Sequence, residues 1–181
     1  DLNLEVYLNE RNLLENFIAR GSVSNFKTKI ISNIDLNEAK FSFFADKSDI
    51  LIKNFYGKTG PIKIIDGDLQ IKISPEISIK SNFNTKLNYN KKFSNYLNFV
   101  KDFYSVDNIT NLEAYLHNSF LINFDQTYKV VNYNYQSNGK VKNANLNFTK
   151  PFHNELIEEK IENLFFRNLE IKTNFSPNKN E

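Results

Sequence analysis

Apolar and polar residues alternate with a period of two along most of the chain. A run from Leu2 to Leu8 places Leu or Val at every even position, and a run from Ala39 to Ala45 places Ala or Phe at every odd position. The longest run extends from Leu112 to Phe124 and is interrupted only at Asn118. Successive side chains of a strand point to opposite faces, whereas a helix would spread these residues around its axis. The pattern therefore predicts antiparallel strands with one buried, apolar face.

The dipeptide Asp66-Gly67 is typical of a tight hairpin turn, because both residues tolerate unusual backbone angles. A turn at this point pairs Ile64 with Leu69 and Ile62 with Ile71, so that all four isoleucine and leucine side chains share one face. A turn at Gly67-Asp68 would pair Ile64 with Ile71 instead, and the two faces would stay segregated. Because a two-residue turn fixes the register of a hairpin, this segregation supports the prediction.

Asn138-Gly139 is the dipeptide preferred in type I′ turns and predicts a second hairpin. A turn here pairs Tyr133 with Ala144 and Val131 with Leu146, and it leaves a ladder of asparagines on the opposite face. A further polar turn is expected at 46–49, before the strand that carries Ile50 and Ile52.

Two segments carry apolar residues at three- and four-residue spacing, which is typical of helices. In the first, Ser94 could cap a helix that extends to Phe103. The second runs from Asn154 to Asn168, and acidic residues near its start would suit the helix dipole. The expected fold is therefore mainly β, a curved and twisted antiparallel sheet with one apolar face, plus one or two short helices. We expect a single β-rich unit over 1–175 and a polar tail over 176–181.

Composition restricts the function further. Lys plus Arg number 23 and Asp plus Glu number 21, interspersed along the chain, so that no clustered basic face for nucleic acid is expected. Cysteine is absent, which excludes thiolate metal sites and cysteine nucleophiles. No apolar run approaches the roughly 18 residues of a membrane span. Because the chain starts at Asp1 without a signal sequence, we expect it to be a segment of a longer exported protein.

No motif in the chain predicts catalysis. His117 and His153 are far apart and lack metal-binding spacing. Asp66 and Asp68 flank a predicted turn instead of a cleft. Segment 57–60, Gly-Lys-Thr-Gly, lacks the spacing of a phosphate-binding loop and is read as a turn. We therefore expect a protein that is not an enzyme and that needs no metal or cofactor.

The central part of the chain resembles a known family. Segments 41–46, 50–57 and 60–71 give, in order, an alternating strand, a strand that ends in Gly57, and a glycine-containing hairpin. Segment 131–146 repeats these features, so that residues 20–150 resemble the AsmA-like family of bacterial envelope proteins. The resemblance implies a long, bent sheet that is open on one side and lined inside by apolar side chains. It also implies a periplasmic location, an inner-membrane anchor outside this chain, and phospholipid acyl chains that slide along the groove between inner and outer membranes.

On this reading the partners are a phospholipid or other acyl lipid and further β-groove segments of the same protein, with no nucleic acid. The apolar face would form the lipid lane. Its expected lining residues are Phe41, Phe43, Ile50, Ile52, Ile62, Ile64, Leu69, Ile71, Ile73, Ile77, Ile79, Val131, Tyr133 and Leu146.

The same residues would equally form the closed core of a β-sandwich, as in an adhesion or ligand-binding module of the cell envelope. A fragment of an outer-membrane barrel is a third reading of the alternation, but the many Lys and Glu residues of the polar face disfavour it. The sequence alone does not separate an open groove from a closed core.

Overall fold

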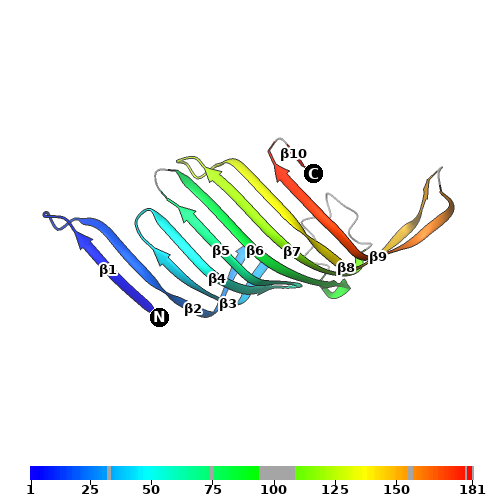
Figure 1. Ribbon diagram of the computed structural model, residues 1–181, viewed down its shortest axis with the longest axis horizontal. Coiled ribbons are helices and arrows are strands. Elements are labelled where there is room, and N and C mark those ends of the chain that lie inside the picture. The colour runs from blue at the N-terminus through cyan, green and yellow to red at the C-terminus, as the bar shows by residue number, and fades with distance from the viewer. Residues whose placement is uncertain (32–33, 74–75, 94–108, 155–156, 178, 181) are drawn as a thin grey trace.

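The computed structural model describes residues 1–31, 34–73, 76–93, 109–154, 157–177 and 179–180, and most of them lie in β-strands. The strands are β1 (Leu2–Leu8), β2 (Leu14–Ile31), β3 (Ile34–Ala45), β4 (Asp49–Thr59), β5 (Ile62–Lys72), β6 (Ile77–Asn90), β7 (Ile109–Phe124), β8 (Val130–Asn154), β9 (Ile157–Ser176) and β10 (Lys179–Asn180). They form one antiparallel sheet in which each strand pairs with its neighbour in the chain. Figure 1 shows this meander as a single curved layer, with β1 at one edge and β10 at the other.

The register assigns every paired residue to one of two faces. Residues directly opposite each other in neighbouring strands share a face, and residues two apart along a strand do as well. One such row runs across six strands and consists of Gly57, Ile64, Thr85, Leu116, Gly139 and Ile171. We call the face that contains this row the concave face and the opposite face the convex face.

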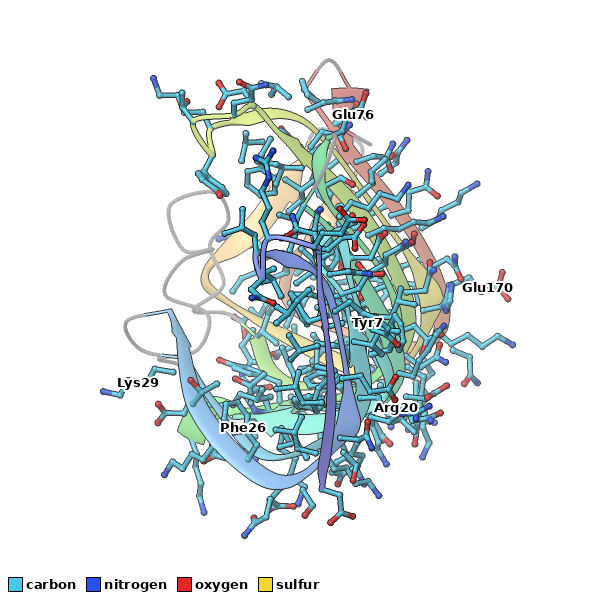
Figure 2. All side chains as sticks on the ribbon, turned by 90° about the vertical axis from the view of Figure 1, so that its left-hand side faces the viewer. Tyr7, Arg20, Phe26, Lys29, Glu76 and Glu170 are labelled. Atoms are coloured by element: carbon cyan, nitrogen blue, oxygen red, sulfur yellow. The ribbon has the colours of Figure 1, made fainter. Side chains whose placement is uncertain are left out.

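The strands bend around the concave face, so that the sheet forms a trough. In the view along the sheet, Phe26 lies inside the bend of β2, whereas Arg20 and Glu170 project from the outside (Figure 2). By the register, Phe26 pairs with Ala39 of the concave face, while Arg20 pairs with Asn3 and Phe44 of the convex face. Each strand therefore crosses the trough, and the trough runs perpendicular to the strands.

Irregular residues near the middle of the strands produce this bend. Asn25, Glu38, Asn54 and Asn168 have φ angles of 52–54°, in the left-handed region. The ladder shifts register beside Asn25 and Glu38, as in a β-bulge. A bulge bends its strand, increases the local twist and moves the apolar positions from one parity to the other. The alternation predicted for single runs thus continues through the whole sheet, but with a change of phase in several strands.

The predicted hairpin at Asp66-Gly67 is wrong. Both residues lie inside β5, where Asp66 pairs with Asn84 and Gly67 pairs with Phe83. The register shift between Ile64 and Asp66 inserts one extra residue. Because of this extra residue, Ile62 and Ile64 before it lie on the same face as Leu69 and Ile71 after it. The prediction that these four side chains share a face is therefore confirmed, whereas the prediction that they pair with one another is wrong. Glycine is required here because a Cβ atom would lie 2.8 Å from Cβ of Phe83.

The predicted hairpin at Asn138-Gly139 is also wrong, because β8 passes through it without a turn. Asn138 pairs with His117 on one side and with Lys172 on the other. A Cβ atom at Gly139 would overlap the carbonyl group of Tyr115, so that close approach of two strands, and not a turn, selects glycine at this position. The turn expected at 46–49 is confirmed: the side chain of Asp46 accepts hydrogen bonds from the amides of Ser48 and Asp49.

The helix predicted over Asn154–Asn168 is wrong in the part that the structure describes, since β9 begins at Ile157. Leu164 and Phe166 lie on the concave face, but Phe165 between them is apolar as well and lies on the convex face under the guanidinium of Arg167. Apolar residues on both faces hide the alternation and imitate a helical pattern. The helix predicted from Ser94 to Phe103 lies outside the described residues. In the described part, 91–93 form a single 3₁₀ turn.

The described strands form one layer, and the core is correspondingly small. The buried apolar side chains are Leu36, Ala39, Tyr89, Ala114, Val141 and Ala144, at the floor of the trough. The chain exposes 13200 Å², whereas a compact 21.2 kDa monomer is expected to expose about 9,100 Å². A single layer leaves both faces of the sheet accessible, which accounts for the difference.

Candidate functional site

The concave face collects nearly all of the predicted lining residues. Those that the register pairs on this face are Phe41, Phe43, Ile50, Ile52, Ile62, Ile64, Leu69, Ile71, Ile77, Ile79, Tyr133 and Leu146. Ile73 follows the end of β5, where its amide donates a hydrogen bond to the carbonyl of Ser48. Val131 lies at a register shift near the start of β8 and is 60% exposed, so that it stands at the rim and not in the trough.

Aromatic rings line the floor of the trough from β2 to β4. The ring centroids of Phe26 and Phe41 are 6.4 Å apart in an edge-on arrangement, and those of Phe41 and Phe55 are 6.0 Å apart. A second pair, Phe83 and Phe120, lies 6.1 Å apart on β6 and β7. Such contacts hold the rings in place beyond what their burial provides. The floor is therefore a defined surface and not a collection of loose side chains.

Gly67 lies between these two aromatic groups and opens a hollow in the floor. The hollow has a volume of about 350 Å³. It is bordered by Ile52, Phe55, Ile64, Gly67, Asp68, Leu69, Ser81, Phe83 and Phe120. The polar groups at its border already have partners: the hydroxyl of Ser81 donates to the carbonyl of Asp68 at 2.7 Å, and the carboxylate of Asp68 lies 2.8 Å from Nζ of Lys53. The hollow thus presents apolar surface, and the polar side chains of Ser81 and Asp68 at its border are already paired.

Beyond the hollow, a group of polar side chains, buried except for the half-buried Tyr135, forms part of the floor on β6 to β8. Asn118 is at its centre and only 3% exposed. Its amide group lies 3.1 Å from the hydroxyl oxygen of Thr85, and its side-chain oxygen accepts hydrogen bonds from Tyr135 and Ser137 at 2.8 and 3.0 Å. We call Thr85, Asn118, Tyr135 and Ser137 the Asn118 cluster. Because its groups satisfy one another, the cluster can be buried without a large penalty.

Next to this cluster the trough contains its best-packed apolar region. Ala114, Val141 and Ala144 are buried there. The partly buried side chains that pack against them are Leu87, Leu112, Leu116, Phe166 and Ile171. The larger side chains of neighbouring strands thus cover the small residues Ala114 and Ala144 at the floor.

The convex face carries most of the charged side chains, together with single exposed apolar residues such as Phe44, Leu121 and Phe165. Ion pairs join neighbouring strands, among them Arg20 with Glu5 at 3.1 Å and Lys58 with Glu38 at 2.6 Å. The hydrogen bond that Lys58 donates to the carboxylate of Glu38 raises the pKa of Lys58 above its ordinary value. Nζ of Lys40 and of Lys63 lie over the ring of Tyr56, at 5.1 and 5.2 Å from its centre. The concave face is therefore the more apolar of the two faces.

The residues considered for catalysis are not brought together. His117 lies on the convex face, where its Nδ1 is 3.0 Å from the side-chain oxygen of Asn84. His153 belongs to the part of β8 whose side chains are not described. Asp66 and Asp68 lie in the middle of β5, and Gly57 lies inside β4. No group of three His, Cys, Asp or Glu side chains that could hold a metal occurs in the described part of the chain.

Several concave residues could not be found from single alternating runs. Leu36, Phe55 and Phe166 lie beyond a change of phase in their strands. The signal that would have found them is an Asn or another polar residue between two alternating runs of opposite parity, as at Asn54 and Asn168, because Asn tolerates positive φ better than most residues.

The trough, its apolar floor and its charged outer surface define a class of protein: a single-layer, open antiparallel β-groove. Comparisons of this chain with protein-family profiles, with curated proteins and with solved structures give no significant match. Within the described residues, no helix is long and apolar enough to span a bilayer.

Proposed function

We propose that this chain is a non-catalytic segment of an AsmA-like lipid-transfer protein, and that its trough carries phospholipid acyl chains between the inner and the outer membrane. The observation that supports the proposal is an apolar concave face that no second sheet covers within the described residues. Burial of an acyl chain stabilises the complex by about 0.8 kcal/mol per CH₂ group. Because contacts between aliphatic groups are non-directional, a chain can be held in the trough and still slide along it.

In this role the whole protein would reside in the periplasm and be anchored in the inner membrane by a segment outside residues 1–181. The edge strand β1 supports the idea that further β-groove segments of the same protein continue the sheet. Its concave residues Leu2, Leu4, Val6 and Leu8 are each more than half exposed, at a strand edge that carries unpaired backbone groups. Exposed apolar edges of this kind are normally paired or covered. An added strand from a neighbouring segment would cover this edge and lengthen the groove.

A closed β-sandwich would require a second sheet packed about 10 Å from the first. All ten strands of the described residues belong to one sheet. The sandwich alternative therefore finds no support from a specific feature of this fold.

Lipid binding by the purified 181-residue chain tests the proposal. We expect native mass spectrometry to detect co-purified phospholipid, and a fluorescent fatty acid to bind to the delipidated protein. Two neighbouring substitutions on β6 distinguish the faces: Ile79→Asn places a polar group on the concave face, and Lys80→Asn changes the convex face only. Ile79→Asn should weaken binding about tenfold, whereas Lys80→Asn should leave it unchanged.

A protein that emerges without lipid and binds no fatty acid would contradict the proposal. Equal loss of binding in the two variants would also contradict it, because the concave face would then have no special part in binding. Circular dichroism of both variants serves as the control for folding.

A further inference from the structure

The floor of the trough is not uniform along its length, and this non-uniformity has a consequence for the ligand. A continuous groove of one character would let an acyl chain rest at any position. Here the aromatic floor of Phe26, Phe41 and Phe55 is followed by the hollow at Gly67, and the hollow is followed by the Asn118 cluster.

We infer that the hollow at Gly67 is a subsite that holds one segment of an unbranched aliphatic chain, and that the chain ends or turns out of the trough at the Asn118 cluster. The inference rests on the proposed function, since it places the ligand of the groove at a particular point of it. It predicts a preferred position of the acyl chain instead of free sliding over the whole floor.

The chemistry of the hollow selects the occupant. Ile52, Ile64 and Leu69 form aliphatic walls, and Phe83 and Phe120 form a fixed aromatic wall on the other side. The hydroxyl of Ser81 is bonded to the backbone, and the carboxylate of Asp68 is paired with Lys53, a residue of the convex face. A ligand with a charge or a hydrogen-bonding group would lose its hydration here without finding a partner, whereas an alkyl segment loses nothing.

The Asn118 cluster explains why the aliphatic segment would stop there. The hydrogen-bond donors and acceptors of the cluster bond to one another, so that they offer little to a polar headgroup. An alkyl chain also gains less free energy from contact with amide and hydroxyl groups than from contact with aliphatic side chains. Tyr135 is held over this site by two contacts, its hydrogen bond to Asn118 and its stacking on Phe175 at 6.1 Å. The ring is therefore fixed beside the floor on the β8 side.

The absence of tryptophan from the chain allows a direct test. A single tryptophan is introduced either in the hollow, as Phe120→Trp, or outside it, as Phe175→Trp, and its fluorescence is measured with stearic acid that carries a nitroxide quencher on the chain. We expect stronger quenching at position 120 than at position 175. Filling the hollow by Ile64→Phe should weaken binding about tenfold, the loss expected when roughly two methylene groups leave an apolar site.

Ile18→Phe is the matched control, because it makes the same change on the convex face, opposite Glu5 and outside the hollow. It should change binding by less than about twofold, a difference well below 1 kcal/mol. Ile52→Phe fills the hollow from the neighbouring strand and replaces Ile64→Phe if that variant does not fold, as judged by circular dichroism.

Equal quenching at the two tryptophans, together with unchanged binding after the hollow is filled, would overturn the subsite while leaving the lipid groove intact. Preferential quenching by a nitroxide-labelled sterol instead of the labelled stearic acid would also overturn it, because a rigid ring system would then be the occupant. Absence of quenching at both positions, with no fatty-acid binding by the unmodified chain, would contradict the proposed function itself.

Discussion

Tyr135 donates its hydroxyl hydrogen to the side-chain oxygen of Asn118 at 2.8 Å, from the neighbouring strand of the same concave face. Ser137 donates to the same oxygen at 3.0 Å. A buried amide in an otherwise apolar floor is stable only if its groups have partners, and here both its oxygen and its nitrogen do. The Asn118 cluster thus makes the pairing of β7 with β8 more specific than alternating aliphatic residues alone would.

Removal of Asn118 should destabilise the sheet strongly. Asn118→Ala leaves the hydroxyls of Tyr135 and Ser137 without this acceptor, and a buried polar group without a partner costs about 1–3 kcal/mol. Tyr135→Phe removes one hydrogen bond but leaves Ser137 on the same oxygen, so that a loss of about 1 kcal/mol is expected. Urea denaturation, followed by circular dichroism, measures both changes.

Asn132→Ala is the control, since Asn132 is an exposed asparagine of the convex face opposite Asn123. It should change the free energy of unfolding by less than about 0.5 kcal/mol. If Asn118→Ala proved no worse than this control, the cluster would have no structural part in the floor.

The left-handed residue Asn54 should respond to substitution in a way that reports on the bend of β4. Its φ of 53° disfavours β-branched residues, so that Asn54→Val should destabilise the protein by about 1–2 kcal/mol. Asn54→Gly adopts this φ without strain and should be nearly neutral. The measurement is again the midpoint of urea unfolding. Similar effects of the two substitutions would show that the backbone angle at this residue does not matter.

These left-handed residues also explain how much of the fold could be predicted. Short runs such as Leu2–Leu8 and Leu112–Phe124 identify their strands correctly, because period-two alternation depends only on local geometry. The two glycine dipeptides misled the prediction of hairpins, because a turn and a bulge with close strand approach both favour glycine or asparagine. Which of them is present depends on the neighbouring strands, and a single strand does not contain this information.

For the candidate site, the aliphatic lining of the central strands was predictable, whereas the hollow and the Asn118 cluster were not. Ile52, Ile64 and Leu69 belong to obvious alternating runs. The hollow depends on Gly67 lying opposite Phe83, and the cluster depends on Asn118 lying opposite Ser137. Both are consequences of register between strands, which alternation within a strand does not fix when bulges change the phase.

The turns at Asp46 and Asp125 should make stability depend on acidity. Hydrogen bonds from the amides of Ser48 and Asp49 lower the pKa of Asp46, and hydrogen bonds from the hydroxyl of Thr127 and the amide of Lys129 lower the pKa of Asp125. A carboxylate whose pKa is lower in the folded state stabilises the protein above its unfolded pKa of about 3.9. This stabilisation is lost as the pH falls through the lower, folded pKa.

Asp46→Asn combined with Asp125→Asn should therefore flatten the acid limb of a stability–pH curve between about pH 2 and 5. The amide oxygen of Asn can accept some of the same hydrogen bonds but does not titrate. Urea midpoints measured across this range test the expectation. As a control, Asp66→Asn removes a carboxylate inside β5 and should leave the acid limb of the stability–pH curve as steep as in the unmodified chain. If the double variant also kept this steepness, the two turns would not be the origin of the pH dependence.

Gly57 and Gly139 lie in the same row of the concave face, and the same substitution should have different effects at the two positions. A Cβ atom at Gly139 would overlap the backbone carbonyl of Tyr115, which cannot move without breaking the ladder. A Cβ atom at Gly57 would lie 2.7 Å from Cδ1 of Leu36, the end of a side chain that can change rotamer. Gly139→Ala should therefore destabilise the protein by about 1–3 kcal/mol.

Gly57→Ala should change the free energy of unfolding by less than about 1 kcal/mol. The side chain of Leu36 must change rotamer to avoid the new Cβ atom, and the cost of this change is offset because Ala lowers the entropy of the unfolded chain. Thermal and urea unfolding of both variants, compared with the unmodified chain, measure the difference. Because Ala is otherwise tolerated in strands, a large loss at Gly139 alone identifies close approach of β7 and β8 as its cause. An unaffected Gly139→Ala would mean that the two strands are further apart than the register of this sheet requires. The floor of the trough would then be wider than the one on which the proposed lipid groove depends.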